Sequence, residues 1–462
     1  MSWDRGPLSV SENGRYLVHE DGTPFFWLGD TAWALFHRFT REEAAVYFQN
    51  RRERGFNVIQ AAALPIGPAG GLDVPNPYGQ DALIGRDPTR PAITEGSNQG
   101  DADQYDWWDH VDALISMAEE QGLYIGLLPA FGNLVAGSDA TLNQRNARAY
   151  GRFLGERYGA RPNIIWILGG DRNAVVGGTS AVDAWRQMAA GIQEGAGDDV
   201  LMTYHPGDAS SSGQWFNTDR WLDFNMIQSG HGTRDRNTYD MIAENYARSP
   251  AKPVVDGEGT YEDHPVDWNP AKGYFRDYDV RKTAYRSVFA GAFGYTYGHP
   301  SVWRRLTTPG EPGPSGPSGL EVSLEFTWRE AIERLGAAQM IYLRRLIESR
   351  PILDRIADLE LIAEHPGDGG QHAEATRASD GSYAMIYIPN ANRTVPIRMG
   401  KLSGDRVTAW WYDPRTGTAT SIGEFESEGT QRFTTPAEGP DWVLVLDDIT
   451  RNFGPPGGAT QR

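Results

Sequence analysis

Apolar runs alternate with amphipathic segments along the first 350 residues of the chain. Each run is short, rich in β-branched residues and almost free of internal charge, as in strands buried on both faces. We count eight such runs, at 25–30, 57–64, 124–130, 163–171, 201–205, 224–231, 253–258 and 293–299. Eight strands with helical segments between them predict an α/β fold, namely a (β/α)8 TIM barrel.

The predicted helices lie at 40–54, 105–121, 141–158, 181–194, 238–247, 280–290 and 326–349. Thr40 and Glu43 have the spacing of a capping box, and Gly122 suits the position after a helix end. The fifth unit is the weakest, because 210–223 lacks a convincing helical pattern. The rival fold is an open doubly wound sheet. Such a sheet would need a glycine-rich, phosphate-binding turn after its first strand, and residues 29–33 do not match that pattern.

The pattern changes after Pro351. Short runs of β character at 382–389, 394–399, 406–412, 419–422 and 442–447 are separated by turn signals, and they predict a small all-β sandwich. We therefore place the barrel at 1–350, the sandwich at 351–448 and a disordered tail at 449–462. The first twenty residues are expected either to add a strand to the sandwich or to cap the barrel bottom.

The junction at 349–353 has no Gly/Ser-rich spacer, and the apolar residues Ile352, Leu353 and Ile356 follow the last predicted helix at once. A flexible tether would be polar and longer. We therefore expect the sandwich to pack tightly on the barrel.

Two predicted connections are long. The segment 65–104 follows the second strand and so lies at the catalytic end, where long loops usually wall or cover a site. The segment 308–319 has glycine at every third position, but it is far too short for a collagen helix. We interpret it as a loop at the rim.

The net charge of −18 opposes tight binding of a nucleic acid, which needs a basic surface, and favours a neutral or weakly charged substrate. The absence of cysteine excludes disulfides, thiolate catalysis and cysteine-based zinc sites. No apolar run could span a bilayer, so no membrane partner is expected. The expected location is cytoplasmic, or secreted if a signal peptide was removed. The 15 Trp and 20 Tyr suit an enzyme that stacks rings on sugars.

Two carboxylates end predicted strands. Glu258 ends the seventh strand between Gly257 and Gly259, and Asp171 follows the fourth after two glycines. Strands four and seven face each other across a barrel mouth, so these side chains converge from opposite sides, as glycoside hydrolysis requires. We predict Glu258 as the nucleophile and Asp171 as the acid/base. Asp256 is the alternative on the seventh strand, since in an extended strand it points to the same side as Glu258.

Polar or aromatic residues also stand at or near the ends of most other predicted strands. Stability alone does not explain such a ring of side chains at the catalytic face of a barrel. We predict that these residues bind substrate: Asp30, Trp33, Asn133, Tyr204, His205, Gln228, His231, His299 and Trp303.

Three of these histidines raise a second hypothesis, a zinc site formed by His205, His231 and His299 with Asp256 or Glu258 nearby. They come from separate strands, and no HExxH or HxH motif occurs. We therefore expect no catalytic metal and no cofactor.

Several segments resemble one known family, the apiosidase-like barrels of glycoside hydrolase family 140 and its relatives. The resemblance covers nearly the whole chain and rests on residues 17–33, 169–173, 228–231 and 256–258, while 411–417 is similar to the β-domain, labelled collagen-binding, that usually follows such barrels. It implies a retaining glycosidase with Asp171 as acid/base and Glu258 as nucleophile. The broader clan mostly has Asn-Glu at strand four, whereas this chain has Gly170-Asp171, which agrees with the apiosidase-like group.

The sequence thus predicts a retaining glycosidase acting on an apioside or on another furanoside or pyranoside. The alternative is a non-catalytic module that binds carbohydrate or protein. The pair of carboxylates discriminates between them, because binding alone would not need it.

Overall fold

The structure, a computed structural model, describes residues 2–66, 71–136, 140–310 and 323–458. Its largest sheet contains eight parallel strands. In chain order they are β4 (Trp27–Thr31), β5 (Val58–Ala62), β6 (Tyr124–Leu128), β7 (Ile164–Gly169), β10 (Met202–His205), β12 (Asn225–Gln228), β13 (Val254–Glu258) and β14 (Gly294–Tyr297). They pair in the order β10-β7-β6-β5-β4-β14-β13-β12, and β11 (Ser210–Ser211) adds antiparallel to β12.

The barrel closes between β10 and β12 without a regular ladder in the described chain. The carboxylate of Asp223 accepts from the backbone N–H of Met202 over 2.7 Å, and the Asp223 N–H donates to Met202 O over 2.9 Å. The Thr203 hydroxyl donates to Phe224 O over 2.6 Å. These bonds join the two remaining edges, so the predicted TIM-type barrel is confirmed.

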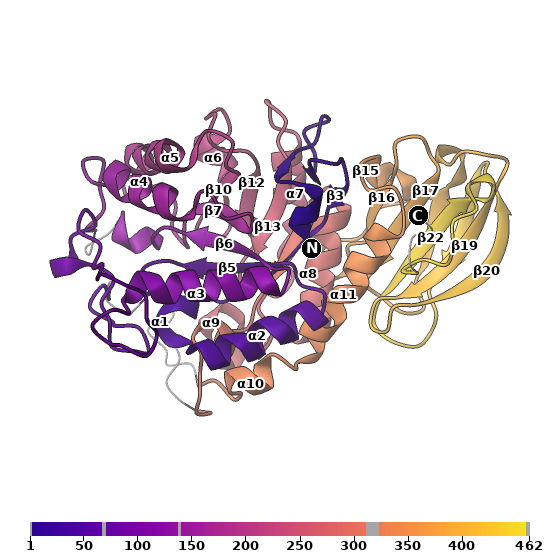
Figure 1. Cartoon of the computed structure of the whole chain (residues 1–462). Coiled ribbons are helices and arrows are strands. Elements are labelled where there is room, and N and C mark those ends of the chain that lie inside the picture. The colour runs from indigo at the N-terminus through magenta and orange to yellow at the C-terminus, as the bar shows by residue number, and fades with distance from the viewer. Residues whose placement is uncertain (1, 67–70, 137–139, 311–322, 459–462) are drawn as a thin grey trace.

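Helices surround the sheet (Figure 1). Their bounds are α1 (Leu35–Arg38), α2 (Arg41–Glu53), α3 (Trp107–Glu120), α4 (Ala147–Tyr158), α5 (Val182–Ala196), α6 (Gly213–Phe216), α7 (Thr238–Tyr246), α8 (Asp277–Phe289), α9 (Pro300–Trp303), α10 (Trp328–Ala331) and α11 (Leu335–Glu348). The predicted capping box of Thr40 and Glu43 is present at the start of α2. The fifth unit contains only the four-residue α6, as the weak pattern at 210–223 indicated.

The last predicted helix is divided into α10 and α11, which differs from the continuous helix expected over 326–349. Arg334 is extended, and its guanidinium pairs with Asp263 over 2.6 Å. The Glu262 carboxylate accepts from the N–H groups of Gly336 and Ala337, the free donors at the start of α11. These two carboxylates stabilise a helix start that the apolar periodicity did not reveal.

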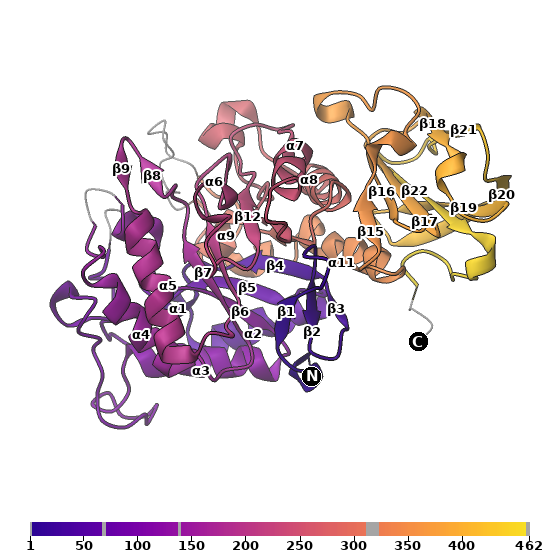
Figure 2. The same ribbon diagram turned by 90° about the horizontal axis from the view of Figure 1, so that it is seen from above.

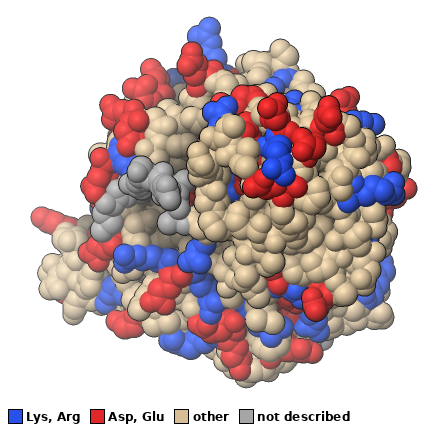
Figure 3. All heavy atoms as spheres, turned by 90° about the vertical axis from the view of Figure 1, so that its right-hand side faces the viewer, with Lys and Arg blue, Asp and Glu red and all other residues tan. Residues whose placement is uncertain are grey.

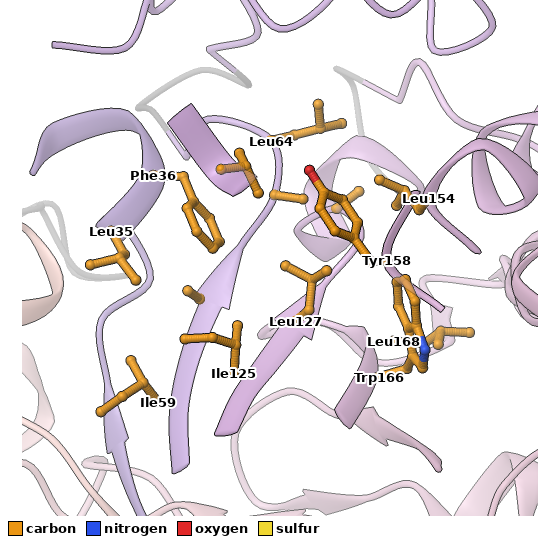
Figure 4. Close-up of a cluster of buried hydrophobic side chains, with 14 of the residues drawn as sticks. Leu35, Phe36, Ile59, Leu64, Ile125, Leu127, Leu154, Tyr158, Trp166 and Leu168 are labelled. Carbon is orange, nitrogen blue, oxygen red and sulfur yellow. The ribbon is translucent and has the colours of Figure 1, made fainter. Parts of the chain in front are cut away.

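Side chains are buried on both faces of the barrel strands. Ile59, Ile125, Leu127, Trp166 and Leu168 point outward into the layer of helices (Figure 4). Their neighbours along the strands belong to a second cluster inside the barrel. This two-sided burial explains why the strands read as continuous apolar runs.

The N-terminal segment caps the barrel bottom, the second of the two predicted alternatives. It forms an antiparallel sheet of β1 (Leu8–Val10), β2 (Leu17–His19) and β3 (Pro24–Phe25). The rings of Trp3 and Phe25 pack on Tyr124 at 5.4 and 5.3 Å, where β6 begins. This sheet therefore covers the end where the strands begin (Figures 1 and 2), so the catalytic groups lie at the other end.

The C-terminal part is an all-β domain. One sheet has the order β15-β16-β17-β22-β19-β20, and β18 pairs with β21 in a second sheet. The bounds are β15 (Arg355–Ala357), β16 (Glu374–Ala378), β17 (Tyr383–Ile388), β18 (Thr394–Arg398), β19 (Arg406–Asp413), β20 (Thr418–Glu426), β21 (Thr430–Thr434) and β22 (Trp442–Asp448). Ile386, Ile397, Phe433 and Leu444 share a core between the sheets, as in a sandwich.

This domain packs directly on α8 and α11 (Figure 1). The Tyr285 ring of α8 stacks on Tyr387 of β17 at 5.1 Å. Arg350 pairs with Asp447 over 2.6 Å, and both side chains are buried. The two domains therefore share one buried apolar cluster at their interface.

On the face shown in Figure 3, acidic and basic side chains are interspersed around a broad uncharged area. The part of that face formed by described residues thus carries no extended positive area of the kind that binds a phosphate backbone.

Residues 449–458, predicted to be disordered, are instead packed on the rest of the protein. The Arg350 guanidinium donates to Gly454 O over 2.9 Å, and the Phe453 ring contacts Tyr383. Residues 459–462 and most of the predicted rim loop at 308–319 lie outside the described residues. In the part that the structure describes, no helix is long and apolar enough to cross a membrane.

Candidate active site

The position of Glu258 depends on a β-bulge at the end of β13. Ile227 of β12 pairs with Asp256, but the next residue, Gln228, pairs with Glu258, so Gly257 is an extra residue. The Gln60 side chain donates to Gly257 O over 2.7 Å and fixes the peptide there. A bulge reverses the alternation of side chains along a strand. Glu258 consequently faces the barrel mouth.

The bulge overturns the expectation that Asp256 and Glu258 point to the same side. The Asp256 carboxylate accepts from the hydroxyls of Ser229 (2.7 Å) and Ser287 (3.1 Å), and Ser287 belongs to the outer helix α8. Burial raises the pKa of Asp256 to about 6, although these hydrogen bonds oppose the shift. Asp256 therefore links the strand to a helix, and Glu258 alone faces the mouth.

Two histidines hold the carboxylate of Glu258. The Nε2 atom of His231 lies 3.0 Å from Oε1, and the Nε2 atom of His205 lies 3.3 Å from Oε2. Burial favours the neutral acid, since Glu258 is only 4% exposed. The adjacent His205 and His231 rings outweigh burial and bring the pKa of Glu258 far below its ordinary value. Glu258 is thus a carboxylate at neutral pH.

Asp171 follows β7 in a turn that its sequence makes possible. Gly169 and Gly170 have φ values of +89° and +112°, and a Cβ at Gly169 would lie 2.2 Å from His205 O. The Asp171 N–H donates to His205 Nδ1 over 3.2 Å, and its Oδ1 accepts from the Gln228 amide over 3.1 Å. The two glycines therefore allow Asp171 to approach the strand that carries His205.

The pKa of Asp171 is shifted in the opposite direction from that of Glu258. Burial and then the negative charge of Glu258 raise it to about 6, while the hydrogen bond from Gln228 lowers it. Two carboxyl groups whose surroundings separate their pKa values can divide the roles of acid and base. Here Asp171 can supply a proton while Glu258 remains ionised.

The structure brings five of the other predicted residues into or beside this site. His205, Gln228 and His231 contact the two carboxylates as described. The Trp33 ring meets His205 edge-on at 5.2 Å. Asn133 lies in a turn whose Gly132 N–H donates to Gly170 O over 2.9 Å. Their contact with a substrate stays a prediction.

Trp303 is the last residue of α9, and its carbonyl accepts from the N–H of Ala34 over 3.0 Å. This bond places the backbone of Trp303 beside the residue that follows Trp33. The partly exposed Trp303 side chain is therefore near the mouth, and its role in binding stays a prediction.

Two predicted substrate-binding residues instead face the helices. The Asp30 carboxylate is fully buried and accepts from Tyr47 (2.6 Å) and Arg51 (3.2 Å), both on α2. The buried Tyr204 hydroxyl donates to Arg172 O over 2.7 Å, and its ring packs on Trp185 of α5. Strand alternation directs these side chains away from the mouth, so the expectation for Asp30 and Tyr204 is corrected.

His299 belongs to a different network. Its Nε2 lies 3.3 Å from Asp263 Oδ2, and its Nδ1 accepts from the Ser301 N–H over 3.1 Å. Asp263 also pairs with Arg276 and Arg334. The zinc hypothesis required His299 beside the other two histidines, and the described residues contain no cluster of three or more ligands that could hold a metal ion.

Three residues of the segment after β13 also belong to the site, although the sequence reasoning missed them. Tyr261 and His264 lie against the His231 ring at centroid distances of 4.3 and 4.5 Å, and Trp268 lies 4.3 Å from His264. The signal was available, since aromatic residues are concentrated directly after Glu258. These residues lie beyond the strand end, where the prediction placed the site.

Known proteins resemble this chain over nearly its whole length. The family described as "Apiosidase-like, catalytic domain" matches residues 11–354, and the one described as "Putative collagen-binding domain of a collagenase" matches 356–447. A structure titled "Glycoside hydrolase" is 36% identical, with a TM-score of 0.86, over 98% of this chain and 99% of its own. A family 5 glycoside hydrolase from Bacteroides vulgatus is 34% identical, with a TM-score of 0.87, over 100% and 97%.

A search of curated proteins found no match. The family models and the two solved structures nevertheless cover the barrel and the β-domain together. The chain therefore belongs to the apiosidase-like family of glycoside hydrolases and is a glycosidase.

Proposed function

We propose that the protein is a retaining glycosidase that acts on a neutral or weakly charged glycan, an apioside or another furanoside or pyranoside. The observation that carries this proposal is the opposite surroundings of two neighbouring carboxyl groups. Glu258 lies between two histidines, which lower its pKa, whereas burial and the charge of Glu258 raise the pKa of Asp171 to about 6. A nucleophile and a general acid need pKa values separated in this way.

In the first step, Asp171 gives its proton to the glycosidic oxygen while Glu258 attacks the anomeric carbon. The bond to the leaving group breaks, and a glycosyl ester forms on Glu258. In the second step, the Asp171 carboxylate takes a proton from water, and the oxygen of that water attacks the anomeric carbon. The ester bond breaks, Glu258 is again ionised, and the sugar leaves with its original anomeric configuration.

The first experiment is a screen of aryl glycosides, furanosides included, with the purified full chain. For each substrate that is cleaved, NMR of the first-formed sugar reports the configuration. Retention supports the double displacement, whereas an inverted product contradicts it.

Variants then assign the roles. Glu258→Ala is expected to abolish turnover, and azide should restore it by forming a glycosyl azide of inverted configuration. Asp171→Ala should lower kcat by about 10²–10⁴-fold for poor leaving groups and much less for activated aryl groups, which need no proton. Asp199→Ala, at an exposed site, is the matched control and should retain full activity. Full activity in Glu258→Ala would refute the mechanism.

A further inference from the structure

The ring of His231 lies between two hydrogen-bond acceptors. Its Nδ1 is 3.1 Å from the carbonyl oxygen of Gly259, and its Nε2 is 3.0 Å from Glu258 Oε1. A carbonyl oxygen has no proton to donate, so Nδ1 must carry one. A carboxylate also only accepts, so Nε2 must carry a second proton as long as Glu258 is ionised. A neutral imidazole has only one N–H and cannot make both bonds.

We infer that His231 is a doubly protonated positioning residue that forms a buried, charge-neutral ion pair with Glu258. For its meaning in catalysis this inference rests on the proposed function, but the charge state itself does not. His205 differs, because its Nδ1 lies near both a donor, the N–H of Asp171, and an acceptor, Pro206 O. Of the two histidines beside Glu258, His231 is the one whose neighbours require two protons.

The surroundings of His231 suit a cation. The ring of Tyr261 lies against it at 4.3 Å and 34°, and the ring of His264 at 4.5 Å and 40°. The face of an aromatic ring attracts positive charge. Trp268 completes the cluster at 6.2 Å. The cation therefore has ring faces and one carboxylate around it.

The other ionisable groups leave this assignment intact. His264 donates through Nδ1 to Pro265 O over 2.7 Å, and burial, followed by the charge of His231, keeps the pKa of His264 well below its usual value. His264 is therefore a neutral ring. Asp208, which flanks Gly230, pairs with Arg236 over 3.1 Å. Glu258 is thus the carboxylate in ion-pair contact with His231 among the described residues.

The ion pair has a consequence for each step. His231 occupies Oε1 and holds the plane of the carboxylate. Glu258 loses its charge when the glycosyl ester forms and regains it when the ester breaks. A neighbouring cation favours breakage of the ester, because the negative charge of Glu258 then returns beside a positive charge. No proton moves between the two residues, and the cation that favours release of the sugar opposes the loss of charge on its attachment.

The charge state can be measured without a substrate. Protein labelled with ¹⁵N-histidine would be studied by long-range ¹H–¹⁵N NMR at pH 7, with the His231 signals assigned from their loss in His231→Gln. Both ring nitrogens of His231 are expected to be protonated. In Glu258→Gln, which removes the negative charge but keeps the shape, one nitrogen should lose its proton. A bare ring nitrogen in the unmodified protein, or two protonated nitrogens in Glu258→Gln, would overturn the inference.

Kinetics on any cleaved aryl glycoside separate charge from position. His231→Gln keeps an N–H donor without charge, and His231→Phe keeps only the ring. We expect the His231→Gln variant to retain a larger fraction of kcat than the His231→Phe variant. In both variants the acid limb of the pH profile of kcat/KM should move to higher pH. An unchanged acid limb would contradict the ion pair. If the unmodified protein cleaves no glycoside, the proposed function fails while the NMR result still decides the charge of His231.

Discussion

Arg281 of α8 and Asp441 of the β-domain form a bidentate ion pair. The Arg281 Nη2 atom lies 2.8 Å from Asp441 Oδ1, and Nε donates to Oδ2 over 3.2 Å. Both side chains are at most 1% exposed. The pair joins the barrel to the β-domain at a place that water does not reach, so neither charge can be removed without leaving the other buried.

Asp441→Ala should therefore lower the free energy of unfolding by about 1–3 kcal/mol, since the buried Arg281 guanidinium keeps Asp277 but loses its two bonds to Asp441. Urea unfolding followed by circular dichroism measures this change. Asp380→Ala is the control, because its partner Arg451 is exposed, and an exposed pair contributes about 0–1 kcal/mol. Equal losses of unfolding free energy in the two variants would show that the buried interface pair stabilises the protein no more than an exposed pair does.

A chain ending at residue 350 should be insoluble or inactive. It would expose Tyr285 and Phe289, which share a core with the β-domain, and it would leave Arg281 without Asp441. Yield of soluble protein and activity on the identified glycoside check this. A chain ending at residue 458 keeps every described contact and should behave as the full chain does. A soluble, fully active barrel would show that the β-domain is an independent appendage.

The value of kcat/KM should decrease as the pH rises above about 6, the raised pKa of Asp171. Asp171 works as an acid only below its raised pKa, and Glu258 is ionised above its lowered pKa. The active form thus exists between the two values. Gln228→Leu removes the hydrogen bond that lowers the pKa of Asp171, so the alkaline limb should move to higher pH. Gln49→Leu, on the exposed side of α2, should leave the limb in place. A shift of the alkaline limb to lower pH in Gln228→Leu would contradict the assignment of Asp171 as the acid.

Asp256 and Glu258 should respond differently to loss of charge. Asp256→Asn should keep kcat within a few-fold and cost about 1–3 kcal/mol of stability, since one of two buried serine hydroxyls loses its acceptor. Glu258→Gln should abolish turnover. Parallel thermal melts and rate measurements distinguish the two. An inactive but stable Asp256→Asn variant would indicate that Asp256, and not Glu258, is the nucleophile.

Asp30→Ala should destabilise the protein without changing KM. The substitution leaves Arg51 buried without its carboxylate, at a cost of about 3–5 kcal/mol. Tyr204→Phe is the milder companion, because it removes one hydrogen bond to Arg172 O, worth about 1 kcal/mol. A raised KM with an unchanged melting temperature would restore either residue to the list of sugar ligands.

The barrel could be predicted because each strand is apolar on both faces, and this leaves a strong signal in the sequence. Glu258 and Asp171 could be named because both follow such runs and have glycine beside them. The orientation of Asp256 could not be predicted, since the extra residue at Gly257 exists only relative to Gln228 on the neighbouring strand. A bulge is a property of a pair of strands, and one strand alone does not reveal it.

Asp30 and Tyr204 were misplaced for a related reason. Both are polar residues at or near a strand end, and the sequence does not show which face of the strand each occupies. Asp30 finds Arg51 on α2, and Tyr204 finds Trp185 on α5. The break before α11 was hidden as well, because its cause is the distant Glu262. Contacts between remote segments decided each of these cases.

The first residues of the loop after β13 lie between two fixed carboxylates. Glu258 lies at its start, and four residues later Glu262 caps α11, the helix that precedes the β-domain and packs against it. Insertions or deletions between these residues would disturb the nucleophile and the domain interface at once. Among relatives of this enzyme, changes of loop length that suit new glycans are therefore expected after β5, where residues 63–106 form a long connection, and not between Glu258 and Glu262.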